Sequence, residues 1–160
     1  MPNQLVTIVN VTMIIETLKK LYLRDLDRLM QEISLYKNEE NIWLTSAGIS
    51  NSAGNLCLHL IGNLNTYIGA QYGNTGYIRN RAEEFSLKNI PRAVLLKKIK
   101  ATMQVIDRSL NNVSENDLEA EYPLLVLEEK TTTEYFLIHL ATHLTYHLGQ
   151  ISYHRRLLDQ

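Results

Sequence analysis

The chain has 160 residues, of which 45% are hydrophobic and 21% are charged, and its formal net charge at pH 7 is −1. This composition is ordinary for a soluble globular protein and the length is that of one domain, so we expect a single domain over residues 1–160. A net charge this small offers no general attraction to phosphate backbones or anionic lipid, which argues against nucleic-acid and membrane partners.

Helical periodicity dominates the chain, which has only three prolines and seven glycines. Residues 9–36 predict a first amphipathic helix, with Met13 and Leu29 among its apolar positions. Residues 37–51 are polar around a short apolar run at Trp43, and they predict a loop with a hydrophobic anchor.

A second helix is predicted over residues 52–71. The glycine- and asparagine-bearing residues 72–89 follow it and predict a loop of the kind that carries functional sites. Pro91 stands in a first-turn position and predicts the start of a third helix, which continues to about Asn112.

Two capping boxes organise the last part of the chain. Ser114 and Asp117 have the spacing of such a box and predict one short helical turn. Thr131 and Glu134 have the same spacing and predict the start of a fourth long helix, which should run to about Leu158. Four long helices with a long crossover loop between them predict an all-α fold, a four-helix bundle.

The compartment follows from cysteine usage and from the absence of targeting signals. The single cysteine, Cys57, excludes an internal disulfide and fits a reducing environment. The first residues lack a basic region followed by an apolar run, so no signal peptide is expected. Residues 135–153 are uncharged, but their three histidines and one glutamine argue against a membrane span. We expect a cytoplasmic protein.

The histidines are unevenly distributed along the chain. Four of the five lie in the last predicted helix, and the fifth lies in the only other long uncharged stretch: His139, His143, His147, His154 and His59. His143 and His147 are one turn apart and share a helix face, and His59 is the only histidine available on another helix. Zinc and nickel accept neutral imidazole, and three protein ligands leave a coordination position open. The pattern therefore predicts a three-histidine metal site with no carboxylate close to the ion.

The remaining histidines have other interpretations. His139, one turn before His143, is a rival ligand, or else it lies behind the ligands or in the core. His154 is too far along the helix to share the ion, and we expect it near the surface beside Arg155. Buried histidines that only hydrogen-bond within a core, a histidine-lined interface, and haem binding through His139 or His143 stay open as alternatives.

Neighbouring residues could contact a ligand or be purely structural. Cys57 is rotated by about 200° from His59 on a helix, so we expect it to pack in the core. Asn63, one turn after His59, could orient a ligand or make a polar contact between helices. Arg79 could meet an anionic substrate, since arginine suits carboxylates and phosphates, or it could pair with Glu83, Glu84 or a neighbouring subunit.

Three segments, HLATHLTYHLGQ, LHLIGNL and GYIRNRAEEF, together resemble the DinB/YfiT-like superfamily, and the likeness covers most of the chain. The resemblance implies an up-down-down-up four-helix bundle, a homodimer, and a zinc or nickel ion on His59, His143 and His147. It also draws attention to Gln150, in the Gly-Gln pair after the two histidines. Members with an assigned activity are thiol-dependent enzymes, including bacillithiol-type S-transferases and a mycothiol-dependent maleylpyruvate isomerase.

Two functions follow from the site and the resemblance together. In the first, a metal-dependent enzyme activates a low-molecular-weight thiol, which attacks a small electrophilic substrate. In the second, the metal only stabilises a dimeric binding or stress-response module.

Overall fold

The computed structural model describes residues 3–160, with side chains described from Met13 onward. These residues contain no strand, which confirms the all-α class. The α-helices are α1 (Asn3–Ser34), α2 (Ala53–Leu64), α3 (Arg81–Ser86), α4 (Arg92–Leu110), α5 (Glu115–Glu119) and α6 (Thr133–Leu158). A 3-10 helix, η1 (Glu39–Trp43), precedes α2, and a π-helix, η2 (Asn65–Ala70), continues it.

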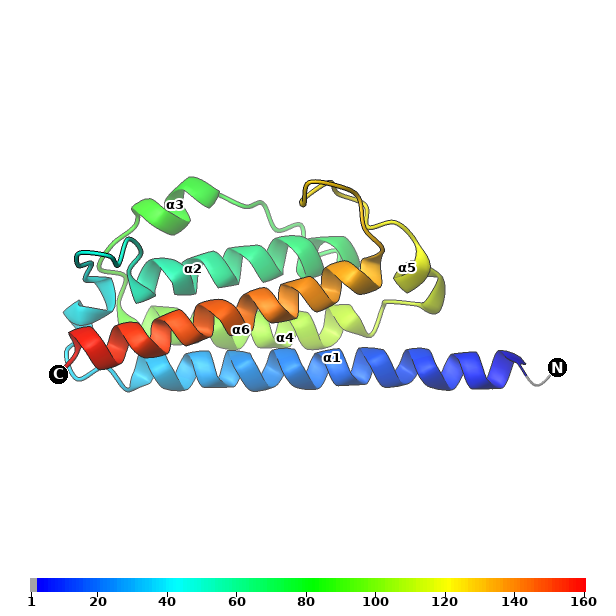
Figure 1. Ribbon diagram of the computed structural model, residues 1–160, viewed down its shortest axis with the longest axis horizontal. Coiled ribbons are helices and arrows are strands. Elements are labelled where there is room, and N and C mark those ends of the chain that lie inside the picture. The colour runs from blue at the N-terminus through cyan, green and yellow to red at the C-terminus, as the bar shows by residue number, and fades with distance from the viewer. Residues whose placement is uncertain (1–2) are drawn as a thin grey trace.

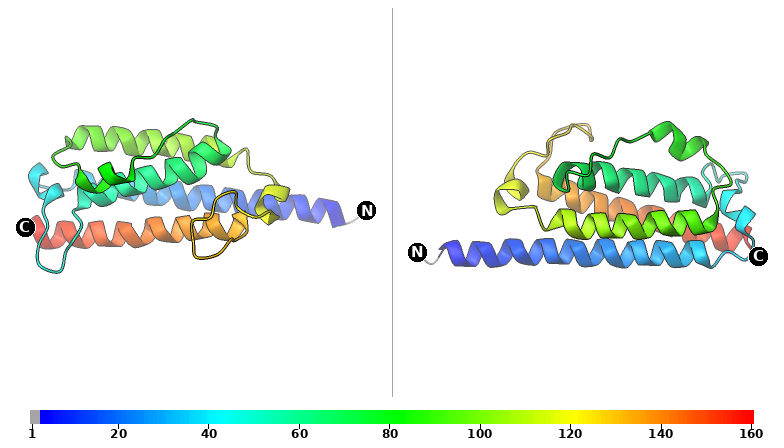
Figure 2. Two further views of the ribbon diagram at one scale, coloured as in Figure 1. Left: turned by 90° about the horizontal axis from the view of Figure 1, so that it is seen from above. Right: turned by 180° about the vertical axis from the view of Figure 1, so that it is seen from behind.

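The main helices, α1, α2, α4 and α6, lie side by side along the length of the molecule (Figure 1). α1 contacts α4 and α6, and α2 contacts the same two helices from the other side. α1 and α6 run towards one end, whereas α2 and α4 run towards the other (Figures 1 and 2). The short helix α3 packs on the outside of α2, and α5 packs near the start of α6. None of the helices in the described part of the chain is long and apolar enough to cross a membrane.

The buried face of α1 follows the expected helical period but omits one residue that we assigned to it. Its core positions include Ile15, Leu18, Tyr22 and Leu29, each separated by three, four or seven residues. Met13 is 62% exposed, so its assignment to the apolar face was wrong. It precedes Ile15 by two residues, a rotation of about 200° that points it away from the stripe.

The predicted hydrophobic anchor before α2 is confirmed. Ile42 and Trp43 in η1 are buried, while Leu44 is exposed. The Trp43 ring packs directly on the backbone of α2 at Gly54, where a Cβ atom would lie only 2.6 Å from the ring. A glycine is therefore needed at this position for the anchor to dock.

The second predicted helix has the expected extent but changes its geometry near the end. Ser52 caps α2 by accepting a hydrogen bond from the amide of Asn55, at 3.2 Å. From Asn65 the turns widen into η2, and the Asn65 side-chain amide donates to the Ile61 carbonyl (2.8 Å) and to Thr102 Oγ1 (2.9 Å). A side chain that hydrogen-bonds backbone groups in this way locally disturbs the regular ladder of the helix.

The starts of the last two helices test the predicted capping boxes. The box at Ser114 and Asp117 is present at α5, as predicted. The cap of α6 is Thr132, whose Oγ1 accepts from the amide of Tyr135 at 3.3 Å, so the assignment to Thr131 was wrong by one residue. The carbonyl of Thr131 instead accepts from the amide of Tyr122 at 2.9 Å, which ties Thr131 to the segment that follows α5.

Candidate metal centre

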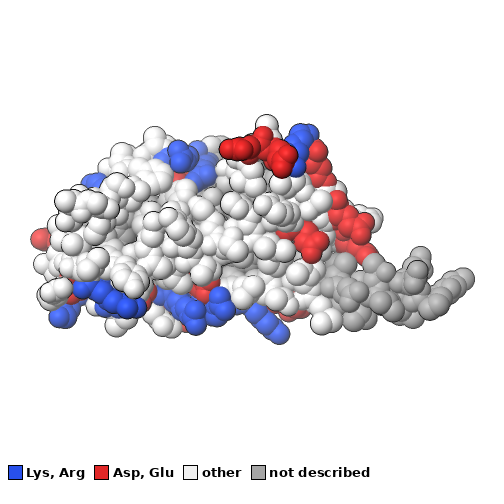
Figure 3. Space-filling model, viewed as in Figure 1, with Lys and Arg blue, Asp and Glu red and all other residues white. Residues whose placement is uncertain are grey.

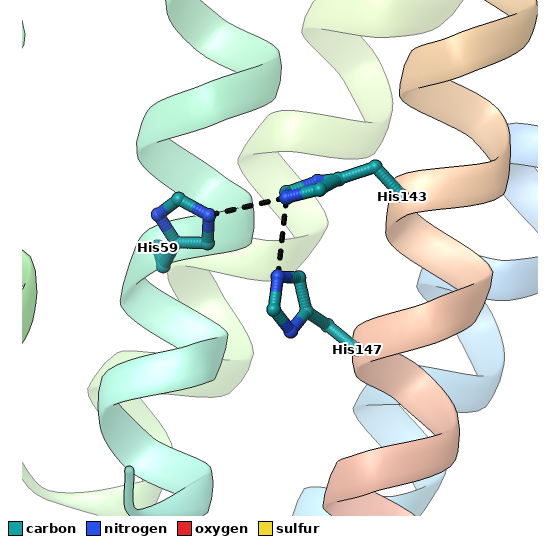
Figure 4. Close-up of side chains that lie close together, drawn as sticks. All are labelled: His59, His143 and His147. Carbon is teal, nitrogen blue, oxygen red and sulfur yellow. Dashed lines mark hydrogen bonds between the residues drawn. The ribbon is translucent and has the colours of Figure 1, made fainter. Parts of the chain in front are cut away.

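Three histidines from two adjacent helices converge in the interior between α2 and α6 (Figure 4). His59 projects from α2, and His143 and His147 project from successive turns of α6. His143 Nε2 lies 3.4 Å from His59 Nε2 and 3.1 Å from His147 Nε2. One ring nitrogen from each of the three lies within 4.8 Å of the others. These are the same three histidines that the sequence predicted as metal ligands.

The spacing of these nitrogens suits a small divalent cation. With zinc–nitrogen bonds of about 2.0–2.1 Å and tetrahedral angles, two ligand nitrogens lie about 3.3 Å apart. The separations of 3.4 and 3.1 Å from His143 Nε2 are close to this value. Three imidazoles with this arrangement could hold a metal ion, and they would leave further coordination positions to a small molecule.

Burial keeps the three imidazoles in the form that binds metals. Removal from water lowers the pKa of His59 and of His147, although hydrogen bonds to Glu84 and to Gln150 respectively oppose that effect. Burial, together with repulsion from the neighbouring imidazoles, lowers the pKa of His143 to about 4. The rings are therefore neutral near pH 7, with lone pairs available to a cation.

The outer nitrogens of two rings have acceptors that select one tautomer. His147 Nδ1 lies 2.6 Å from Gln150 Oε1, so Gln150 contacts a candidate ligand. His59 Nδ1 lies 3.0 Å from Glu84 Oε2. Because both partner atoms accept, these two contacts favour a hydrogen on Nδ1 and a free lone pair on Nε2 of each ring. His143 Nδ1 is buried and has no hydrogen-bond partner among the described residues.

A charged pair lies beside the site, contrary to the expectation of a site without a nearby carboxylate. Glu84 is only 5% exposed, and Arg79 holds it through both prongs of the guanidinium, with Nε 2.7 Å from Oε1 and Nη2 2.8 Å from Oε2. Of the partners proposed for Arg79, the structure therefore selects Glu84. The contact of Glu84 with His59 was not predicted, because the helix that carries it, α3, was assigned to a loop.

A model of the protein family described as "Protein of unknown function (DUF1572)" matches residues 10–160. The chain belongs to this family. No curated protein and no solved structure matches the chain. The family description names no activity, so the function of this DUF1572 protein has to be inferred from the geometry of its site.

Other candidate residues of this DUF1572 protein lie outside the cluster. The His139 ring stacks between its neighbours on α6, with its centroid 5.9 Å from that of Phe136 and 6.2 Å from that of His143. Asn63 is buried, but its Oδ1 has no hydrogen-bond partner in the described part of the chain. Cys57 is fully buried, as predicted, and burial raises the pKa of its thiol to about 12.

His154 is not near the surface, so this expectation was wrong. It is 3% exposed; its Nδ1 lies 2.7 Å from the hydroxyl of Tyr36, and its Nε2 lies 2.9 Å from the carbonyl oxygen of Leu44. The hydroxyl donates to Nδ1 and the Nε2–H donates to the carbonyl, which satisfies both nitrogens of a neutral ring. His154 therefore joins the end of α6 to the end of α1 and to the segment after η1.

Proposed function

We propose that this protein is a divalent-metal-dependent enzyme of the DinB/YfiT-like type, possessing the up-down-down-up four-helix bundle of that superfamily. The observation that carries the proposal is the convergence of three neutral imidazole nitrogens, contributed by His59, His143 and His147, on one point. Histidine ligands of this kind suit zinc or nickel. We further propose that the enzyme is a thiol S-transferase, by analogy with the activities known in that superfamily.

The chain's own residues would hold and orient the ion. His59, His143 and His147 would donate Nε2 lone pairs, and Gln150 and Glu84 would keep two of the rings in the required tautomer. His59 is buried, whereas His143 and His147 are only partly buried, so a small molecule could approach from their side. When bound, the ion would supply Lewis acidity and lower the pKa of a thiol.

The proposed reaction transfers a low-molecular-weight thiol to a small electrophile. The thiol releases its proton to the solvent, its sulfur forms a bond to the electrophilic carbon, and the leaving group departs from that carbon with the electron pair. Asn63 and His139 lie one turn from His59 and His143 on their helices, and they remain candidates for contact with the substrate. Glu84 engages Arg79, so the role proposed for Arg79 is to hold this carboxylate rather than to bind an anionic substrate.

Metal analysis of the purified protein tests this proposal. We expect one zinc or nickel ion per chain in the wild type and a loss of stoichiometric metal in His147→Ala. His139→Ala, on the same helix but outside the cluster, is the matched control and should keep its metal. Full metal content in His147→Ala would contradict the assignment of the three ligands.

A non-catalytic, metal-stabilised binding or stress-response module is the second candidate. It is favoured by one feature, since an ion on these residues would tie α2 to α6. A structural ion contributes strongly to folding and has a closed coordination shell, whereas a catalytic ion keeps an exchangeable ligand. Thermal unfolding with and without chelator, together with spectroscopy of the cobalt-substituted protein, separates the two. A screen of thiols paired with electrophiles then tests turnover.

We also propose that the protein is a cytoplasmic homodimer. The single cysteine suits a reducing compartment. Beyond its first turn, the outer face of α6 carries several exposed uncharged side chains: Ile138, Tyr146 and Tyr153. Charged side chains lie mainly around the margins of this view of the molecule (Figure 3). Uncharged aromatic surface of this kind is common where proteins associate, and light scattering of the purified protein would give the oligomeric state.

A further inference from the structure

We infer that Glu84 is a positioning residue that selects the tautomer of His59 required for metal binding. The inference rests on the proposed metal site but concerns a residue outside the ligand set. His59 Nδ1 has two neighbours of opposite kind, a carboxylate oxygen of Glu84 at 3.0 Å and Nη2 of Arg79 at 3.2 Å. The carboxylate only accepts and the guanidinium only donates, so each favours a different tautomer of the ring.

Glu84 decides between these two tautomers. With the carboxylate in place, the Nδ1–H of His59 donates to Glu84 and Nε2 keeps its lone pair. Arg79 then donates to the same carboxylate, from Nε to Oε1 at 2.7 Å and from Nη2 to Oε2 at 2.8 Å. Without the carboxylate, Nη2 of Arg79 would donate to Nδ1, and the hydrogen of the neutral ring would move to Nε2. A hydrogen at that atom removes the lone pair that faces His143 Nε2, 3.4 Å away, and that a cation needs.

The sequence of α2 builds a docking face for the segment that carries Glu84. Asn55, one turn before His59 on the same helix, donates from Nδ2 to the carbonyl of Glu84 and to that of Leu87, both at 2.9 Å. These bonds fix the backbone at both ends of the last turn of α3. The carboxylate of Glu84 is thereby delivered to His59 by a rigid short helix rather than by a free loop.

Because Gly62 has no side chain, the carboxylate of Glu84 can lie directly against α2. A Cβ atom at this position would overlap Glu84 Oε1 and lie 2.8 Å from the carboxyl carbon. The buried carboxyl group is also held by Arg79, so it cannot move away from Gly62 without disturbing that ion pair. Gly62→Ala should therefore displace the Glu84 carboxylate from His59 while Glu84 itself stays unsubstituted.

The first test is made on the metal-free protein, by NMR of the imidazole nitrogens of His59. We expect Nδ1–H in the wild type and in Glu84→Gln, because the amide oxygen can still accept. We expect Nε2–H in Glu84→Ala, and a return towards Nδ1–H when Arg79→Ala is added to it. Retention of Nδ1–H in Glu84→Ala would overturn the inference.

The second test measures zinc affinity by competition with a chromogenic chelator. Outer partners of metal-bound histidines typically contribute about 10- to 100-fold in affinity. We expect a loss of this size in Glu84→Ala and in Gly62→Ala, a smaller loss in Glu84→Gln, and partial recovery in the Glu84→Ala/Arg79→Ala double variant. The exposed neighbour on α3 supplies the matched control, Glu83→Gln, which should bind zinc as the wild type does.

Failure of the inference is distinguishable from failure of the proposed function. If Glu84→Ala is folded by circular dichroism and binds zinc as tightly as the wild type, the role of Glu84 is overturned and the metal site stands. If the wild type takes up no ion, the proposed function is overturned, and the tautomer spectra alone then support or overturn the role of Glu84.

Discussion

Replacing Tyr36 by phenylalanine removes one hydroxyl from the junction between α1 and α6. In the wild type this hydroxyl donates to His154 Nδ1 at 2.7 Å, and the two residues are only 2% and 3% exposed. The ring of phenylalanine fills the same space, so packing is retained. The substitution thus isolates the hydrogen bond and leaves the lone pair of Nδ1 buried without a donor.

The cost of this change follows from the burial of the acceptor. A buried polar atom left without its partner lowers the free energy of unfolding by about 1–3 kcal/mol. For a chain of this length, each kcal/mol corresponds to a melting temperature lower by about 2–4 °C. We therefore expect the melting temperature of Tyr36→Phe to fall by roughly 2–12 °C.

Urea denaturation and calorimetry of metal-free protein measure both quantities. Tyr135→Phe is the control, since Tyr135 is 58% exposed and its hydroxyl can bond to water in either state. Its stability should equal that of the wild type. A Tyr36→Phe variant as stable as Tyr135→Phe would refute the account of His154 as a buried, hydrogen-bonded junction.

Further predictions concern protonation, thiol reactivity and packing. Burial lowers the pKa of His154 below 6.5, so at acid pH the unfolded chain binds a proton more readily than the folded protein does. The free energy of unfolding therefore decreases as the pH falls below about 6.5, by up to about 1.4 kcal/mol per pH unit. His154→Phe removes this term and should flatten the profile of stability against urea between about pH 7 and 5.5. The Cys57 thiol, buried and with its pKa raised to about 12, should react with a disulfide reagent only after denaturation; rapid labelling of the native protein would be inconsistent with its burial. Gly54→Ala should push the Trp43 ring off α2, lower stability by about 1–3 kcal/mol and shift the tryptophan emission to the red, whereas unchanged emission would argue against the close contact.

The ligand set was accessible from the sequence because local geometry determines most of it. The four-residue spacing of His143 and His147 places them on one face of any helix, whatever its surroundings. His59 could be added because it was the one remaining histidine on another helix. That α2 lies against α6, as the site requires, depends on packing and became visible only in the structure.

The sequence-based predictions failed for residues whose environment is set by partners far away along the chain, or by which of two adjacent positions faces the core. Both partners of His154 are more than a hundred residues away along the chain, at Tyr36 and Leu44, so no local pattern indicated its burial. Glu83 and Glu84 are adjacent and chemically identical. Only the orientation of the six-residue helix α3 makes the second one buried and the first exposed.

Anomalous X-ray diffraction from crystals of the zinc- or nickel-loaded protein tests the metal site most directly. We predict one anomalous peak per chain, with Nε2 of His59, His143 and His147 each about 2.0–2.1 Å from it in the zinc form. A peak at any other position, or none at full metal saturation, would contradict the proposed centre.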